Sequence, residues 1–326
     1  MTHGARVWIA LGTVYLLWGS TYLGIELTGE TIPPLLAVGV RFLTAGGLMF
    51  ALTAWRRGSA VLRVTRRELL ACALVGALLL AGANALLFVA ERHVPTGLSS
   101  LIIASVPLWL VLMRTLTGDR PPRAALGGVV VGFGGVALLV HPSGHAPLWG
   151  LLLLLGSALL WATGSFLSGR VPLPADSFAA TAYEMLAGGL LLLPIGIATT
   201  HPHPSHFSGR SIFGFFYLVT FGSVVGFTAY VWLLDNAPLG TVATYAYVNP
   251  IVAIALGATV LHESLTWTIG LGAALVLACV AVVVRRESIP PEAEAMPAGA
   301  AVVSSGRRRD RARRLLGRRA AAARDR

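Results

Sequence analysis

The sequence predicts an all-α integral membrane protein with ten transmembrane helices, arranged as two inverted five-helix repeats. Three observations predict this fold. Apolar residues make up 56% of the chain and charged residues 12%, which is typical of a protein that lies in a lipid bilayer. Apolar windows of about 20 residues, the length of a membrane-spanning helix, recur along the chain. Residues that lie 143 positions apart also match, as Trp18 with Trp161 and Pro107 with Pro250, which indicates a duplicated unit.

The apolar windows divide evenly between the two copies. They cover residues 7–27, 33–55, 69–91, 95–114, 123–141, 148–169, 177–199, 211–233, 239–261 and 267–285. We therefore expect a first repeat over residues 7–141 and a second over residues 148–285. Because each repeat has an odd number of spans, the second enters the membrane from the opposite side. Two inverted repeats are typical of carriers whose binding site lies between the halves.

Arginines predict the orientation of the spans, since the chain contains no lysine. If the N-terminus is inside, the inner connections hold Arg6, Arg56, Arg57, Arg63, Arg66, Arg67, Arg114, Arg120, Arg123, Arg170, Arg285 and Arg286. The outer connections then hold only Arg92 and Arg210. Inner loops of membrane proteins carry the excess of positive charge, so both termini are expected in the cytoplasm.

The C-terminal segment, residues 286–326, is expected to be a disordered, Arg-rich cytoplasmic tail. Residues 285–326 contain 12 arginines and five acidic residues, which is +7 of the formal net charge of +11. The tail either remains solvated without a specific partner or contacts anionic lipid head groups. It lacks the aromatic residues that stack on bases, so nucleic acid is not an expected partner.

Two spans carry aromatic and polar side chains at intervals of four residues, which places them on one helix face. These residues are Trp18, Tyr22 and Glu26 in the first span and Thr241, Tyr245 and Asn249 in the ninth. Because polar groups are costly against lipid, both faces are expected to point into the bundle. They form either packing surfaces or the walls of a binding site.

Pro107 and Pro250 are repeat counterparts in the interiors of the fourth and ninth spans. A proline inside a helix removes a backbone hydrogen bond and kinks or loosens the helix. A matched pair of such positions predicts hinges for alternating access. The alternative is a fixed kink that serves packing.

Charge is costly inside an apolar span, and Arg41, Glu184 and Glu26 are the charged side chains of interest there. Arg41 lies in the second span, and its repeat counterpart is Glu184 in the seventh. By depth in the bilayer, a suitable partner for Arg41 is Glu26, and we expect a structural ion pair between them. Glu184 is then a buried carboxyl without a counter-charge. It is a candidate for proton coupling, the alternative being a neutral acid that holds helices together by hydrogen bonds.

The motifs of common enzymes and ATP-driven pumps are absent from the sequence. It contains no Walker loop, no His-Glu-x-x-His and no Gly-x-Ser-x-Gly. We therefore expect neither an enzyme nor a cofactor, and energy must come from a gradient or from the substrate itself. His201, His203 and His206 cluster in one outer loop, but no cysteine or carboxylate stands beside them. We expect no functional metal site there.

Several short motifs resemble those of EamA-type carriers of the drug/metabolite transporter superfamily. They are Leu17-Trp18-Gly19-Ser20-Thr21-Tyr22, Glu30-Thr31-Ile32-Pro33-Pro34, Arg41-Phe42, Tyr245-Ala246-Tyr247-Val248-Asn249-Pro250 and His262-Glu263-Ser264-Leu265-Thr266. The resemblance extends from about residue 7 to residue 286 and implies a carrier of the bacterial plasma (inner) membrane. Position 26 often holds a basic residue in such carriers, and Glu184 stands where a glutamine or an apolar residue is expected.

The resemblance also implies a function and a set of residues that line the central cavity. Such carriers usually export amino acids, other metabolites or toxic compounds, so gradient-driven efflux of a small molecule by alternating access is expected. Uptake or exchange by the same fold, or a membrane scaffold or sensor that transports nothing, are the alternatives. The lining residues implied for this chain are Trp18, Tyr22, Asn84, Trp161, Ser165, Tyr230, Tyr245 and Asn249.

Overall fold

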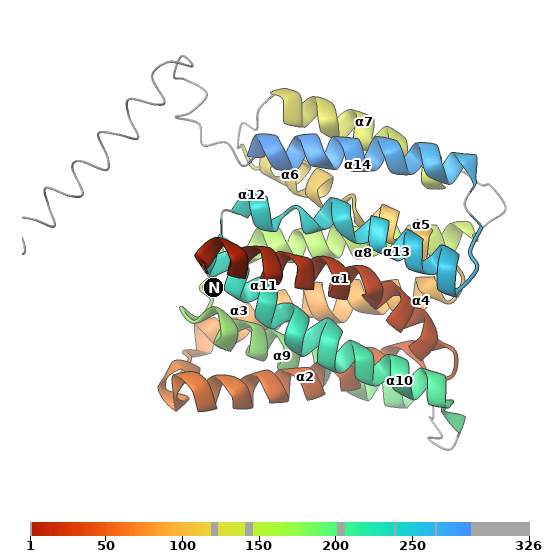
Figure 1. Ribbon diagram of the computed structural model, residues 1–326. Helices are drawn as coiled ribbons and strands as arrows, with labels where there is room; N and C mark the ends of the chain where they lie inside the picture. Colours follow the sequence, from red (N-terminus) through yellow and green to blue (C-terminus); the bar gives the residue numbers. More distant parts are fainter. Residues whose placement is uncertain are drawn as a thin grey trace, which may run out of the picture. The chain divides into compact units, whose positions relative to one another are not determined.

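The computed structural model describes residues 2–118, 123–140, 146–200, 206–237, 239–264 and 266–287. Every regular element within these ranges is a helix, and the chain up to Arg286 forms one compact unit (Figure 1). The expected tail lies outside the described residues from position 288 onward.

The five spans of the first repeat are formed by single helices or by helices that follow one another directly. They are α1 (His3–Gly29); α2 (Pro34–Arg57), followed by the short η1 (Ser59–Leu62); α3 (Arg66–Gly76), the π-helix η2 (Ala77–Ala83) and α4 (Asn84–Glu91); α5 (Thr96–Ile103) and α6 (Val106–Leu116); and α7 (Arg123–Val140).

The second repeat follows the same plan. Its spans are α8 (Leu148–Ser168); α9 (Ser177–Thr200); α10 (Gly209–Tyr217), the π-helix η4 (Leu218–Val225) and α11 (Gly226–Asn236); α12 (Leu239–Val242) and α13 (Tyr245–Val260); and α14 (Trp267–Glu287). Seven of the ten spans are long and apolar enough to cross a membrane. The other three contain shorter apolar helices, Leu126–Leu139, Tyr245–Val260 and Ile269–Val282. The ten predicted spans are therefore confirmed.

Exposed tryptophans mark the two ends of the bundle. We call the end at which α1 begins the proximal end, and the end at which α1 finishes the distal end; Figure 1 shows α1 between them. Trp8 and Trp55 are exposed near the proximal end, and Trp149 and Trp267 are exposed at the distal starts of α8 and α14. Tryptophans prefer the two membrane–water interfaces, so this distribution fits a bundle that spans a bilayer.

Two ion pairs show that the repeats are inverted. The connection between the first and second spans pairs with the start of α10 through Glu30 and Arg210, 3.2 Å apart. The corresponding connection of the second repeat pairs with the end of α2 through Asp176 and Arg57, 2.7 Å apart. The first pair lies at the distal end and the second at the proximal end. The first connections of the two repeats therefore lie at opposite ends of the bundle, as inverted repeats require.

Helices α2 and α9 cross through a reciprocal contact of repeat-related residues. A Cβ atom at Gly46 would lie 2.9 Å from the backbone nitrogen of Leu186, and one at Gly189 would lie 2.6 Å from that of Leu43. Gly189 and Leu186 are the repeat counterparts of Gly46 and Leu43. The missing side chains let the two backbones touch, so this crossing joins the repeats around their pseudo-twofold axis.

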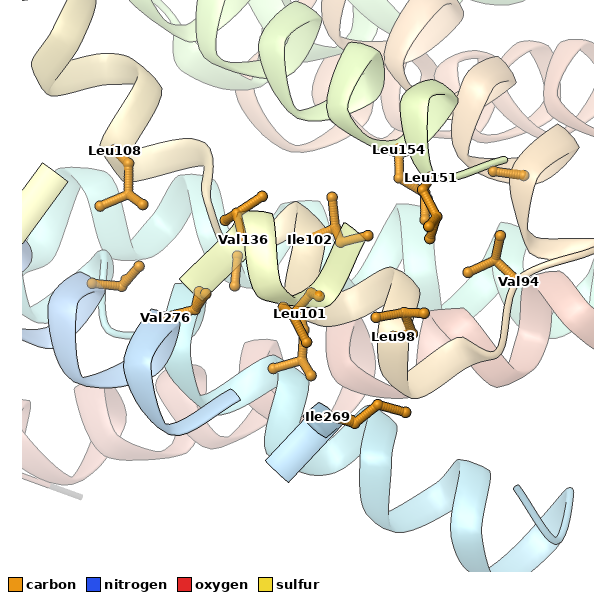
Figure 2. Close-up of a cluster of buried hydrophobic side chains, with 14 of the residues drawn as sticks. Val94, Leu98, Leu101, Ile102, Leu108, Val136, Leu151, Leu154, Ile269 and Val276 are labelled. Carbon is orange, nitrogen blue, oxygen red and sulfur yellow. The ribbon is translucent and has the colours of Figure 1, made fainter. Parts of the chain in front are cut away.

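A second contact between the repeats forms the largest apolar core (Figure 2). Its buried side chains come from both halves, including Leu101 of α5, Val136 of α7, Leu154 of α8 and Val276 of α14. A Cβ at Gly135 would lie 2.9 Å from the Cβ of Leu275, so α7 and α14 also meet through a glycine. The polar site described below lies outside this core.

Candidate functional site: an aromatic cluster between the repeats

Three aromatic rings of the second repeat meet around Trp18 of α1, which belongs to the first repeat. The Trp18 ring lies 5.2 Å from Phe227 and 4.9 Å from Tyr230 of α11, and 5.1 Å from Tyr245 of α13. Tyr230 and Tyr245 are 5.8 Å apart, nearly at right angles. These centroid separations are those of favourable edge-to-face contacts. Three predicted lining residues, Trp18, Tyr230 and Tyr245, are therefore brought together.

Glycines allow the helices to come this close. A Cβ at Gly226 would lie 2.6 Å from Nε1 of Trp18, and one at Gly19 would lie 2.6 Å from the Cβ of Val252. Gly226 begins α11 and Gly19 follows Trp18 in α1, so each helix presents a small residue where the other helix approaches. The tight packing of α1 against α11 and α13 depends on these two positions.

The third span of each repeat contains a π-helix, and the two π-helices occupy nearly equivalent positions. In each one, a backbone carbonyl accepts a hydrogen bond from a side chain. The carbonyl oxygen of Leu79 in η2 accepts from Nδ2 of Asn84 at 2.9 Å. Its repeat counterpart, the carbonyl oxygen of Gly222 in η4, accepts from Nε1 of Trp18 at 3.2 Å. π-Helical turns are frequent at functional sites, and both lie beside predicted lining residues.

The remaining predicted lining residues differ in their positions. Trp161 packs on the small core formed by Val106, Ala158 and Ala162 and interacts with the side chain of Tyr245. Tyr22 and Asn249 are buried, and the Oδ1 atom of Asn249 has no hydrogen-bond partner in the described part of the chain. It is a free acceptor at the α13 side of the site.

Asn84 and Ser165 do not join the aromatic cluster by any direct contact among the described residues. The Asn84 amide donates to the chain of its own π-helix. Ser165 is half-buried, and its carbonyl oxygen accepts from the hydroxyl of Ser168. Asn84 therefore has a structural role in the third span.

Both predicted proline hinges lie close to breaks in their spans. The fourth span is interrupted at 104–105, so Pro107 stands in the first turn of α6 and not in a helix interior, as the sequence had predicted. A proline there loses no helical hydrogen bond. Pro250 does lie inside α13, and the break in its span is at 243–244. This break also separates Thr241 of α12 from Tyr245 of α13, so the second predicted stripe is not one continuous helix face.

The ion pair predicted between Arg41 and Glu26 is not formed in the described structure. Arg41 is buried, its Nε donates to Oγ of Ser223 at 2.8 Å, and its Nη1 has no hydrogen-bond partner among the described residues. A Cβ at Gly222 would lie 3.3 Å from its Nη2. The side chain therefore points toward η4, whereas Glu26 lies at the distal end of α1. Matching depth alone did not identify the neighbour.

Glu184 is half-buried in α9, where this helix packs on α3. A Cβ at Gly76 of α3 would lie 2.3 Å from the Glu184 carbonyl oxygen. The carboxyl lies near enough to Cys72 and to Tyr230 for electrostatic interaction. Glu184, the predicted candidate for proton coupling, therefore lies within electrostatic reach of the aromatic cluster.

The sequence interpretation missed two acidic residues at the distal end. Glu91, the last residue of α4, is buried, and both of its carboxyl oxygens lack hydrogen-bond partners within the described ranges. Glu263, after α13, accepts from the backbone nitrogens of Thr96 at 2.7 Å and Gly97 at 3.1 Å. Glu263, which belongs to the second repeat, thereby caps the start of α5 in the first repeat. The signal for Glu91 was an acid in the last turn of an apolar span; Glu263 stood in the family motif without an assigned partner.

The predicted loop histidines yield no metal site in the described part of the chain. His201 and His203 lie outside the described residues, and His206 lies inside them. No group of three or more histidine, cysteine or acidic side chains within the described ranges could hold a metal ion.

Ten apolar helices in two inverted repeats, with aromatic and polar side chains gathered between the repeats, define a membrane protein of the carrier class. The chain belongs to the EamA-like transporter family, whose model matches residues 6–141 and 148–285. The resemblance found in the sequence motifs is thus confirmed over both repeats.

Relatives with transporter names cover most of the chain. The "Uncharacterized inner membrane transporter YedA" of Escherichia coli (strain K12) is 37% identical over 264 residues, which are 79% of this chain and 83% of that protein. The "Probable amino-acid metabolite efflux pump" of the same strain is 25% identical over 81% of this chain and 90% of its own length. A crystal structure with 22% sequence identity shares the fold, with a TM-score of 0.61 over 84% of this chain and 96% of that one.

Proposed function

We propose that this protein is a secondary transporter that exports a small metabolite, amino acid or drug by alternating access. The observation that carries the proposal is the aromatic cluster of Trp18, Tyr230 and Tyr245, because its rings come from both repeats. Such rings bind the apolar part of a substrate only while the repeats are closed around it. Tilting of one repeat against the other then exposes the same site to one side of the membrane at a time.

Arg41 supplies positive charge for an acidic group on the substrate. A guanidinium group remains charged in proteins, and this one is buried with an unpartnered Nη1 beside η4. Ser223 fixes its Nε and leaves the outer nitrogens for a carboxylate. An amino acid carries such a group, and a relative is named as a probable amino-acid metabolite efflux pump. Both observations support an amino acid or a related acid as cargo.

Other lining residues complete the proposed site. The free acceptor of Asn249 binds a donor group of the substrate, and Tyr22 and Trp161 extend the wall around the cluster. Asn84 and Ser165 belong to the proposed lining at positions away from the cluster. The aromatic side chains favour an amphipathic cargo with one apolar part and few polar groups.

Pro107 and Pro250 serve as hinges in this mechanism. Each lies close to a break in a span that belongs to a different repeat. At such positions, fewer backbone hydrogen bonds must change when the two ends of a span tilt apart. The matched pair allows both repeats to bend by the same means.

A transmembrane gradient supplies the energy, and Glu184 is one candidate for the residue that couples it. Its carboxyl lies within electrostatic reach of Tyr230 and so of the aromatic cluster. A proton gained or lost at Glu184 would change the charge of the site itself. Replacement by glutamine tests this role: gradient-driven export that is undiminished in E184Q excludes it.

The carrier lies in the bacterial inner membrane with its proximal end and both termini in the cytoplasm. The arginine-rich connection between α2 and α3 lies at the proximal end, in agreement with the positive-inside rule, and a relative is named as an inner membrane transporter. The Arg-rich tail then meets the anionic inner leaflet.

Metabolite profiling tests the proposed function. Bacterial cells that express the wild type and cells that express Trp18→Ala at the same level are compared with empty-vector cells, and the medium and cell extract are both profiled. Export predicts a compound that rises in the medium with the wild type only. A compound that rises inside the cells indicates uptake or exchange. No change in either pool at verified membrane expression contradicts transport and favours a scaffold or sensor.

A further inference from the structure

The carboxyl group of Glu91 is the least satisfied acid in the described bundle. Glu91 is only 2% exposed, and neither of its oxygens has a hydrogen-bond partner among the described residues. It ends α4 at the distal end of the third span, beside the start of α5. A carboxylate without a partner at such a place is strongly disfavoured, so the group holds a proton or a cation.

The groups around Glu91 argue against a tightly bound metal cation. Glu26 of α1 and Glu263 lie close enough to interact with it electrostatically. The acidic side chains nevertheless do not converge as a metal-binding group within the described ranges. The carboxylate of Glu263 is already engaged with the backbone of α5.

No neighbouring element supplies a compensating base. Tyr22 of α1 interacts with Glu91, and the exposed Arg92 acts on Glu26. His93 is exposed and packs on Trp149 of α8, and Arg41 of α2 is held by Ser223. The described residues of α5 and α8 carry no charged side chain. A proton is therefore the species that fits this position.

The same neighbours place ionisable groups on both sides of Glu91, toward the distal surface and toward the aromatic cluster. Glu26 and Glu263 are half-buried and lie toward the distal surface. Tyr22 is buried and interacts electrostatically with both Glu91 and Tyr245. Glu91 thus stands between groups that meet water and a hydroxyl that leads to the proposed site.

We propose that Glu91 binds the proton that drives transport, receiving it from the distal side through Glu26 and releasing it toward the substrate site through Tyr22. The step is a proton relay without any redox change: an O–H bond breaks at Glu26 as one forms at Glu91, and on release the Tyr22 oxygen accepts the proton of Glu91 while the Tyr22 hydroxyl gives up its own toward the site. The proposal rests on the proposed function for its role in transport. It places the coupling proton at Glu91 and not at Glu184.

Infrared difference spectroscopy of the full-length protein in liposomes tests the binding of the proton without any substrate. A protonated carboxyl has a C=O stretching band apart from the amide bands, and a pH step makes it appear or vanish. We expect this band in the wild type and its loss in E91Q. The matched variants E184Q and E30Q each remove another acid and are expected to retain it. A band that persists in E91Q, or that vanishes in E184Q, overturns the proposal.

A second variant covers the case in which E91Q fails to fold. Glu91→Asp keeps the carboxyl, so the band is expected to persist at a shifted frequency. An unshifted band in E91D overturns the proposal as firmly as one that persists in E91Q.

Export of the compound found by metabolite profiling tests the role of the proton in driving transport. In vesicles, E91Q is expected to move that compound down its own gradient and to lose accumulation driven by a pH gradient. Undiminished accumulation in E91Q overturns the proposal. If the wild type moves no compound at all, the proposed function fails, while the infrared result still decides whether Glu91 binds the proton.

Discussion

The indole nitrogen of Trp18 donates a hydrogen bond to the carbonyl oxygen of Gly222, 3.2 Å away. Gly222 lies inside the π-helix η4, so the first span of one repeat donates to a carbonyl in the third span of the other repeat. The equivalent carbonyl of the first repeat, at Leu79, is satisfied locally by Asn84. The two π-helices are thus matched in position, but these two equivalent carbonyls differ in partner: that of η4 is bound across the repeats and that of η2 within its own span.

Trp18→Phe is expected to destabilise the protein. Phenylalanine keeps most of the ring contact with Tyr230 and Tyr245 but cannot donate to Gly222. A buried acceptor without a partner costs about 1–3 kcal/mol. Thermal unfolding in detergent, followed by intrinsic fluorescence or scattering, measures the change. Export of the cargo compound is expected to fall as well, because the cluster loses its anchor to η4.

Trp8→Phe is the matched control for this prediction. Trp8 lies in the same helix but is 69% exposed, and surface substitutions of this kind usually change stability by less than about 0.5 kcal/mol. If W18F and W8F unfold at the same temperature, the bond to Gly222 does not stabilise the bundle.

Asn84→Leu is expected to destabilise the third span by a similar amount. The apolar side chain leaves the Leu79 carbonyl unpaired in an apolar environment, at a cost of about 1–3 kcal/mol. Asn236→Leu removes the same kind of bond, from Nδ2 to the carbonyl of Trp232 at 2.8 Å, at the end of α11 where the side chain is only half-buried. We expect a clearly smaller loss for N236L in the same unfolding assay. If N84L and N236L lose the same stability, the bond from Asn84 to Leu79 stabilises η2 no more than a half-buried bond at a helix end does.

Gly46→Ala is expected to loosen the crossing of α2 and α9. The new Cβ would lie 2.9 Å from the backbone nitrogen of Leu186, so one helix must move, and overpacking of this kind costs about 1–3 kcal/mol. Gly47→Ala is an internal control, since a Cβ there meets nothing within 4 Å. A lower unfolding temperature in G46A with none in G47A supports the crossing. Equal stability of the two variants would contradict it.

The sequence was sufficient for the spans because hydrophobicity alone marks the residues that lie in a bilayer. All ten predicted spans coincide with helices of the structure or with helices in direct succession. The breaks at 104–105 and 243–244 and the two π-helices were not predicted. Apolar composition continues through these irregularities, whereas backbone hydrogen bonding, which defines them, leaves no trace in residue polarity.

Only part of the site was predicted, because a sequence does not show toward which neighbour a side chain turns. Helical spacing of four placed Trp18 and Tyr22 on one inward face, and both are buried. Depth in the bilayer suggested Glu26 for Arg41, but depth does not say toward which neighbour a side chain turns, and the structure gives Ser223. Glu91 was counted as the end of a span. The packing of α1, α2, α5 and α8 against α4 makes that end an interior.

Glu263→Gln is expected to loosen the start of α5. The carboxylate accepts from the backbone nitrogens of Thr96 and Gly97, and it places negative charge at a helix N-terminus, where charge and capping each contribute about 1 kcal/mol. Glutamine offers one acceptor oxygen and no charge. Amide hydrogen exchange, read by mass spectrometry on peptides that cover residues 95–103, is expected to speed up at this turn.

Glu30→Gln separates this effect from a general loss of negative charge at the distal end. Glu30 pairs with the exposed Arg210 at 3.2 Å, and exposed pairs contribute at most about 1 kcal/mol. Exchange over residues 95–103 is therefore expected to stay at the wild-type rate in E30Q. Because Glu263 belongs to the second repeat and α5 to the first, faster exchange in E263Q alone would show that the repeats are joined through this cap. Unchanged exchange in E263Q would mean that α5 keeps its start without it, and that the distal contact between the repeats lies elsewhere.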